Sequence, residues 1–252
     1  MRFKMMKILQ FIIYFLILIL PLKNLLAETL NTDISQKTIS ISSNFTGKKI
    51  LLFGNREVEG DIIITITGPK EKVLVHEKSK KFGIWVNSKK IVFSEVPSYY
   101  AIASNRKINN IVPKSLQEEL QIGTSKLKIK AINHSIVAST KIEDFKNGLV
   151  RNKIRKNLYS SDENSVKFNN KLFRSEISFP TNAPEGKYKI NTYLINNSKI
   201  INSKENLIFI SKVGIERKIY NFANQEPALY GIFAIIIAIL SGSIASIIFR
   251  RI

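Results

Sequence analysis

The sequence predicts a mainly β protein: an immunoglobulin-like β-sandwich with a short helical insert, followed by one C-terminal transmembrane helix. Three observations predict this class. An uncharged apolar run lies at 229–249, and a second apolar run lies near the start of the chain. Between positions 37 and 104, turn signals recur about every ten residues, a spacing typical of all-β sandwiches.

Residues 1–27 have the features of a secretory signal peptide. Three basic residues precede an apolar stretch at 8–20, and Ala27 ends a candidate cleavage site. An uncleaved anchor is the alternative, although the stretch is short for a membrane span and Lys23 interrupts it. Both interpretations place residues 28–228 on the far side of the membrane from the cytoplasm.

The first β-rich region, 28–112, contains successive short runs of β-branched and aromatic residues. The run at 61–67, for example, ends at Gly68 and Pro69, a turn signal. We expect strands at 38–42, 49–53, 61–67, 73–76, 84–86, 91–93 and 99–103, with a turn from Gly54 to Gly60.

The pattern of residues 113–160 predicts a helical segment, which we expect to pack on or between the sheets. Ser115 with Glu118, and Thr140 with Glu143, have the spacing of capping boxes, which mark helix starts. Apolar residues recur at helical spacing after the second box.

The second β-sandwich-like region is 161–211. A strand at 171–179 leads into a turn rich in proline and glycine, and the alternation that follows resembles the late strands of immunoglobulin-like sandwiches. A hairpin turn at 196–198 then leads into 200–210. The residues expected to share one buried face are Tyr188, Ile190, Thr192 and Leu194.

Residues 212–228 form a juxtamembrane segment. Ile215, Ile219 and Phe222 recur at helical spacing, which predicts a short amphipathic helix. Its apolar stripe would lie on the membrane surface or pack on the β-rich domain.

The apolar run at 229–249 has the length of a membrane span. As a helix it rises about 31 Å, which matches a hydrocarbon core of about 30 Å. Two arginines in the tail, 250–252, indicate a cytoplasmic C-terminus under the positive-inside rule. Small residues recur every four positions, a pattern that permits close helix packing or arises by chance: Ala234, Ala238, Gly242 and Ser246.

The composition is strongly basic, with 39 Lys and Arg against 19 Asp and Glu. The excess favours anionic partners, or it reflects a lysine- and asparagine-rich composition alone. The basic residues are scattered and no nucleic-acid-binding motif occurs, so we expect no nucleic-acid partner. The chain has no cysteine, which excludes disulfides and lipid attachment at cysteine.

Candidate catalytic groups are few. His76 and His134 lack metal-binding spacing, and we expect no metal or other cofactor. Glu57, Glu59 and Asp61 cluster in one turn region, where they would serve acid/base chemistry, bind a cation, or simply face water.

Four further residues are candidates for a binding surface. Trp85, the sole tryptophan, is expected in the core, with an exposed platform beside Asn87 as the alternative. Tyr99 and Tyr100 should point to opposite faces of a strand, so one of them is expected to face outward unless both are packed in the core.

Six short motifs follow one another along the chain: Phe53-Gly54, Glu59-Gly60-Asp61-Ile62, Gly68-Pro69, Gly83-Ile84-Trp85-Val86-Asn87, Val96-Pro97-Ser98-Tyr99-Tyr100-Ala101 and Pro227-Ala228-Leu229-Tyr230-Gly231. In this order they resemble a family of alphaproteobacterial transmembrane proteins (Alph_Pro_TM). The resemblance implies a signal peptide, a periplasmic domain and one C-terminal span. It carries over no catalytic residue, and it suggests a permease of the sulfite-exporter type as partner.

We therefore expect a non-enzymatic accessory or binding protein of the bacterial inner membrane, with its N-terminal domain in the periplasm. Its partner would be a multi-span permease, or a second copy bound through the transmembrane helix. Two alternatives remain: an envelope enzyme that uses the acids near Glu59 and Asp61, and a structural tether that binds anionic envelope polymer.

Overall fold

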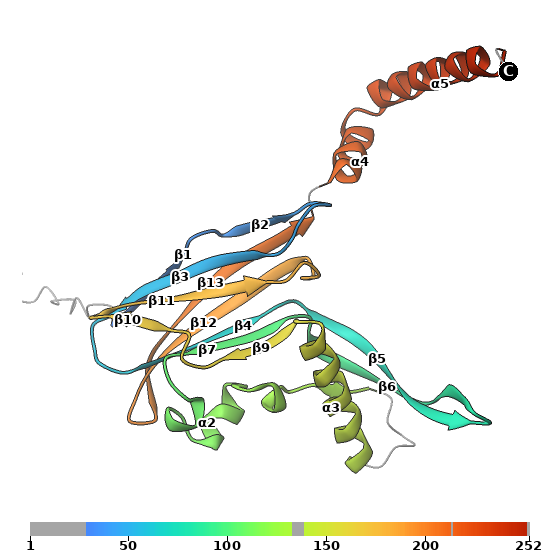
Figure 1. Ribbon diagram of the computed structural model, residues 1–252. Coiled ribbons are helices and arrows are strands. Elements are labelled where there is room, and N and C mark those ends of the chain that lie inside the picture. The colour runs from blue at the N-terminus through green and yellow to red at the C-terminus, as the bar shows by residue number, and fades with distance from the viewer. Residues whose placement is uncertain (1–28, 133–138, 213, 251–252) are drawn as a thin grey trace, which may run out of the picture.

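A computed structural model describes residues 29–132, 139–212 and 214–250 (Figure 1). The chain is mostly β with one C-terminal apolar helix, which confirms the predicted mainly β class, while the immunoglobulin-like arrangement stays a prediction. The predicted signal peptide at 1–27, His134 and the last two residues of the predicted cytoplasmic tail lie outside the described residues.

Two sheets form the body of the molecule. The first is antiparallel, in the order β1 (Leu30–Ile34), β3 (Lys48–Arg56), β11 (Leu172–Phe179), β10 (Lys167–Asn169). The second has the order β2 (Thr38–Ile41), β13 (Lys199–Lys212), β12 (Gly186–Asn196), β4 (Asp61–Thr67), β7 (Tyr100–Ser104), β9 (Tyr159–Asp162). Its two outermost pairings are parallel and the inner ones antiparallel.

The two β-rich regions of the sequence interleave within these sheets. Strand β3 pairs with β11, and β4 pairs with β12, so each sheet joins early and late segments of the chain. The buried side chains of both sheets belong to one hydrophobic cluster. The segments 28–112 and 161–211 therefore share a single core.

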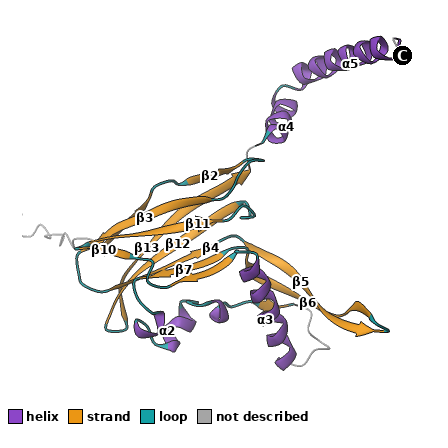
Figure 2. Cartoon of the chain, in the orientation of Figure 1, coloured by secondary structure: helices purple, strands orange, loops and turns teal. Residues whose placement is uncertain are grey.

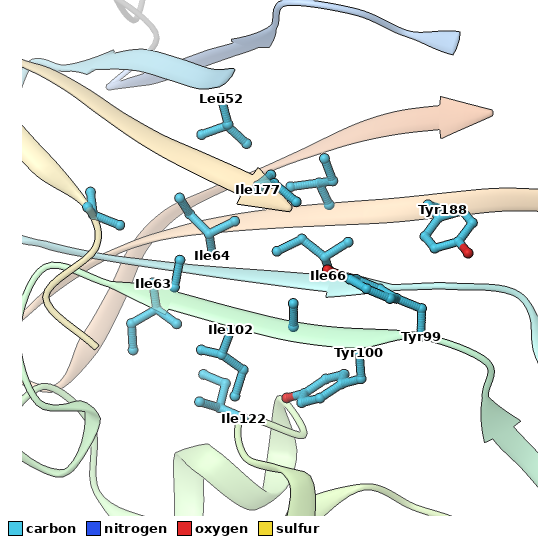
Figure 3. Packing of buried hydrophobic residues seen from close by; sticks show 14 of the residues in the cluster. Leu52, Ile63, Ile64, Ile66, Tyr99, Tyr100, Ile102, Ile122, Ile177 and Tyr188 are labelled. Carbon is cyan, nitrogen blue, oxygen red and sulfur yellow. The ribbon is translucent and has the colours of Figure 1, made fainter. Parts of the chain in front are cut away.

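The core lies between the two sheets (Figure 3). Leu52 and Ile177 from the first sheet face Ile64 and Ile66 from the second, and all four are almost completely buried. The predicted face of β12 is confirmed, because each of its members is fully buried: Tyr188, Ile190, Thr192 and Leu194.

The second sheet is also covered on its other face. Short helices lie below β7 and β9 in Figure 2, and Ile122 packs beneath Ile63 and Ile102 in Figure 3. Strands β4 and β7 are consequently buried on both faces. The covering helices are η1 (Ile108–Asn110), α2 (Lys114–Glu119) and η2 (Thr124–Lys126).

A long hairpin leaves the body between β4 and β7 (Figure 1). It consists of β5 (Lys70–Lys81) and β6 (Ile84–Pro97), with the short β8 (Lys130–Ala131) beside β6. Helix α3 (Ser139–Arg155) packs Phe145 and Leu149 onto the base of the hairpin, where they form a second small core with Ile91, Phe93 and Val96.

A partly buried ion pair also joins α3 to the hairpin base. Lys153 is only 8 % exposed, and its ammonium group binds the carboxylate of Glu71 and donates to the carbonyl oxygen of Ser98 at 3.3 Å. The partners satisfy this charge, as a buried ammonium requires.

Several predicted boundaries are wrong in detail. The run 84–86 and the run 91–93 belong to one continuous strand, and β3 extends through Gly54 as far as Arg56. Ser115 lies inside α2, whose N-cap residue is Pro113, and Thr140 lies inside α3, so neither is a helix cap. The predicted helical segment also breaks into the short helices α2 and η2, the short strand β8 and the longer helix α3. Four strands were not predicted: β1, β8, β9 and β10.

We expect Gly54→Ala to destabilise the β domain by about 1–3 kcal/mol, because the added methyl group overpacks the β1–β3 contact. Its Cβ would lie 2.2 Å from the carbonyl oxygen of Asn31 and 2.7 Å from Cζ of Phe173. Thermal unfolding of the purified full chain, followed by circular dichroism, measures the change.

The matched control is Gly148→Ala in the interior of α3, where a Cβ meets no atom within 4 Å. This variant should gain about 0.5–1 kcal/mol, because alanine favours helix more than glycine does. Equal melting temperatures for the two variants would contradict the close approach at Gly54.

Candidate functional sites

The membrane anchor is the clearest functional element. Helix α5 (Pro227–Arg250) contains a candidate span, Pro227–Phe249, and none of its most apolar window is buried within the protein. Its side chains are therefore available to lipid or to another helix. The predicted row of small residues runs along this exposed surface: Ala234, Ala238, Gly242 and Ser246.

The juxtamembrane segment forms α4 (Ile215–Gln225), as predicted from its helical spacing. The ring of Phe222 packs against Tyr230 and Phe233 of α5, at centroid distances of 6.1 and 6.0 Å. Ile219 remains about half exposed. Phe222 therefore packs on the anchor itself. Packing on the β-rich domain, one of the two expectations for this stripe, is not observed for Phe222.

The tip of the β5–β6 hairpin carries three large apolar side chains in solvent. Ile84 is 68 % exposed, Trp85 is 65 % exposed and Phe82 is fully exposed. The expectation of a core tryptophan is therefore wrong, because β6 extends beyond the body and no described residue covers its first residues (Figure 1). Asn87 is exposed on the same strand, opposite Lys78.

The two adjacent tyrosines are both buried, so neither faces outward. The hydroxyl of Tyr99 donates to the carbonyl of Ser178 at 2.8 Å, and that of Tyr100 donates to the carbonyl of Gln121 at 2.5 Å. The two rings do point to opposite faces, but the second sheet is covered on both. Burial raises the pKa of both hydroxyl groups, which makes them unsuitable as bases.

Two of the three acids around the β3–β4 turn, Glu57 and Asp61, are engaged with separate partners, and Glu59 is exposed. Asp61 accepts hydrogen bonds from Asn105 at 2.9 Å and from Nε of Arg106 at 2.7 Å. Glu57 accepts a hydrogen bond from Lys171 at 2.7 Å.

These partners set the charge state of both acids. Burial alone would raise the pKa of Asp61, but the hydrogen bonds from Arg106 and Asn105 hold it below its ordinary value. The hydrogen bond from Lys171 lowers the pKa of Glu57. A general acid at neutral pH needs a raised pKa, so both shifts run against that role.

His76 lies away from these acids, on the exposed side of β5. It lines a hollow of about 460 Å³ between β5 and α3, together with Glu71 and Lys153. Those two residues already bind each other. Among the described residues, no group of three or more acids and histidines could hold a metal ion.

A shallow groove crosses the outer face of the first sheet, and sequence reasoning missed it. It encloses about 750 Å³. Phe53, Phe168 and Leu172 line it with partly exposed apolar surface, and Lys167 and Arg174 add positive charge. The available signal was the unbroken apolar run at 50–53, which places apolar side chains on both faces of β3.

The arrangement of this chain agrees with one family of known proteins. The family model described as "Putative transmembrane protein (Alph_Pro_TM)" matches residues 29–251, which is most of the chain. No curated protein and no solved structure matches this chain. The match covers the β domain, the hairpin and the anchor together, and the chain therefore belongs to the Alph_Pro_TM family.

Proposed function

We propose that this protein is a non-enzymatic accessory protein of the bacterial inner membrane. Its β domain lies in the periplasm, and α5 docks laterally on a transmembrane partner. The observation that carries the proposal is the anchor: a single apolar helix, none of whose most apolar window is buried by the rest of the described chain.

The distribution of charge supports the orientation. The span carries no charge and is followed directly by Arg250 and Arg251. Positive charge next to a span favours the cytoplasmic side. An N-terminal signal at 1–27 would deliver the intervening domain to the opposite side.

The helix surface supports lateral docking. In lipid, helices associate through close backbone packing rather than through the hydrophobic effect, and small residues permit this approach. A Cβ built at Gly242 meets no atom within 4 Å, so the surface at this position is open. The family resemblance favours a permease of the sulfite-exporter type as the partner, and a second copy of this chain is the other occupant we consider.

The state of the acids supports a role without catalysis. Glu57 and Asp61 each pair with a different basic residue, and neither shares a hollow with His76. The groove on the first sheet is more compatible with a binding role in the periplasm than with catalysis. Its combination of exposed rings and two cations suits a ligand with an apolar body and an anionic group.

The orientation can be tested with single cysteines, because the natural chain has none. In spheroplasts, a membrane-impermeant maleimide should label Lys199→Cys, which lies at the exposed β12–β13 turn. It should label Arg251→Cys only after detergent lysis. The reverse pattern would contradict the periplasmic placement of the domain.

Lateral docking can be tested by enlarging the small-residue row. We expect Ala238→Leu and Gly242→Leu to reduce co-purification of the partner in mild detergent by about tenfold, since a bulky side chain prevents close helix approach. The readout is mass spectrometry of affinity-purified protein.

The matched control is Ser243→Leu, an equally large change on another face of the same helix. Its hydroxyl bonds only to the carbonyl of Ile239 one turn earlier. Identical co-purifying proteins in the wild type and in all three variants would remove the docking part of the proposal.

A further inference from the structure

We propose that the tip of the β5–β6 hairpin is a second membrane contact, which inserts into the interfacial region of the anionic bilayer that α5 spans. The tip is defined here as residues 78–90. This inference goes beyond the proposed function, because it needs the membrane anchor but no docking partner.

The first argument is the conformation of the turn. Phe82 and Gly83 form a two-residue hairpin loop, and both have positive φ, 49° and 82°. Loops of this kind favour Asn-Gly, because a bulky residue at positive φ is strained. A phenylalanine here is fully exposed and also strained, so neither packing nor turn geometry accounts for it. Strain of this sort points to a function.

The second argument is the charge around the apolar side chains. Ile84 pairs across the hairpin with Lys81, and Trp85 pairs with Lys80, so each apolar side chain stands beside an ammonium group. The tip contains five lysines and no acidic residue: Lys78, Lys80, Lys81, Lys89 and Lys90. Tryptophan and other apolar side chains bordered by lysine are typical of segments that lie at an anionic membrane surface.

The third argument is the shape of the tip. Three apolar side chains at the end of a two-stranded finger offer little area, whereas a stable protein interface buries about 800 Å² on each partner. A bilayer needs no complementary surface, because its interface accepts a convex tip. We therefore commit to lipid as the occupant.

The fourth argument is position. In the view of Figure 1, the hairpin and α5 both project to the right of the β-sandwich. The part of β6 that projects beyond the small core, residues 84–90, reaches about 23 Å at about 3.3 Å for each residue. Since α5 already holds the protein in the bilayer, the tip experiences a high local concentration of lipid, and a weak contact suffices.

Trp85 provides the test, because it is the sole tryptophan of the chain. The full-length protein is reconstituted in vesicles of phosphatidylcholine, with or without phosphatidylglycerol. We expect Trp85 emission at shorter wavelength in the anionic vesicles, and quenching by brominated lipid that is at least about twofold stronger than in neutral ones.

Two variants should lose this signal while retaining the fold. Phe82→Asn combined with Ile84→Thr removes apolar surface but introduces residues that favour the turn and the strand, so the hairpin should persist. Lys80→Gln combined with Lys81→Gln removes charge alone. The matched controls alter exposed residues elsewhere and should quench like the wild type: Ile200→Ser with Ile201→Ser, and Lys114→Gln with Lys128→Gln.

Three results would overturn the proposal. In the first, Trp85 emits as in water in both kinds of vesicle. In the second, its emission shifts with protein concentration but brominated lipid does not quench it, which would indicate a second copy on the tip. In the third, only brominated lipid in separate, added vesicles quenches it, which would indicate contact with another membrane.

Discussion

The pairing of β4 with β7, buried on both faces, is the constraint on which the rest of the structure depends. Five consecutive pairs join these strands, from Ile63 with Ser104 to Thr67 with Tyr100. One face packs against the first sheet and the other against the helical insert. A polar side chain at most of these positions would lack a partner, which explains the run of isoleucines in β4.

This pairing also determines where the hairpin begins. The segment from Gly68 to Tyr99 is an excursion between two strands that must lie side by side. Its ends are joined by backbone hydrogen bonds, from Gly68 N–H to the Tyr99 carbonyl and from Ser98 N–H to the Pro69 carbonyl, both 2.8 Å. The small core with α3 and the Lys153–Glu71 pair then hold the base. The protein thus builds a supported base for a finger whose end contacts nothing within the described chain.

The sequence was sufficient for elements whose pattern has one interpretation. Polar residues alternate with Tyr188, Ile190, Thr192 and Leu194, and a strand with one buried face is the ordinary reason for such alternation. The uncharged run at 229–249 predicted the anchor, because no short loop or strand needs such a length of apolar residues. In both cases local chemistry determines the structure without reference to distant residues.

The sequence was not sufficient where distant partners decide the outcome. Residues 84–86 have the composition of a buried strand, and their own side chains do not indicate that the partner strand also extends into solvent. Tyr99 and Tyr100 alternate as expected, but only the later helical insert shows that both faces of their sheet are covered. One local signal was available for the tip. Lysines of β5 precede the apolar side chains at 82–86 and lysines of β6 follow them, which is unusual for a core strand.

The anchor and the hairpin together bear on how the domain is oriented. A single helix with a short connection leaves a domain free to rotate about the membrane normal and to tilt. A second contact, at the end of a finger fixed at its base, would limit the tilt and turn one defined side of the sandwich away from the membrane. The groove on the first sheet and the hairpin belong to the same body, since β3 and β4 follow each other in the chain and share one core. Membrane contact at the tip would therefore fix the direction in which the groove opens, and a partner bound through α5 would meet the groove in one orientation only.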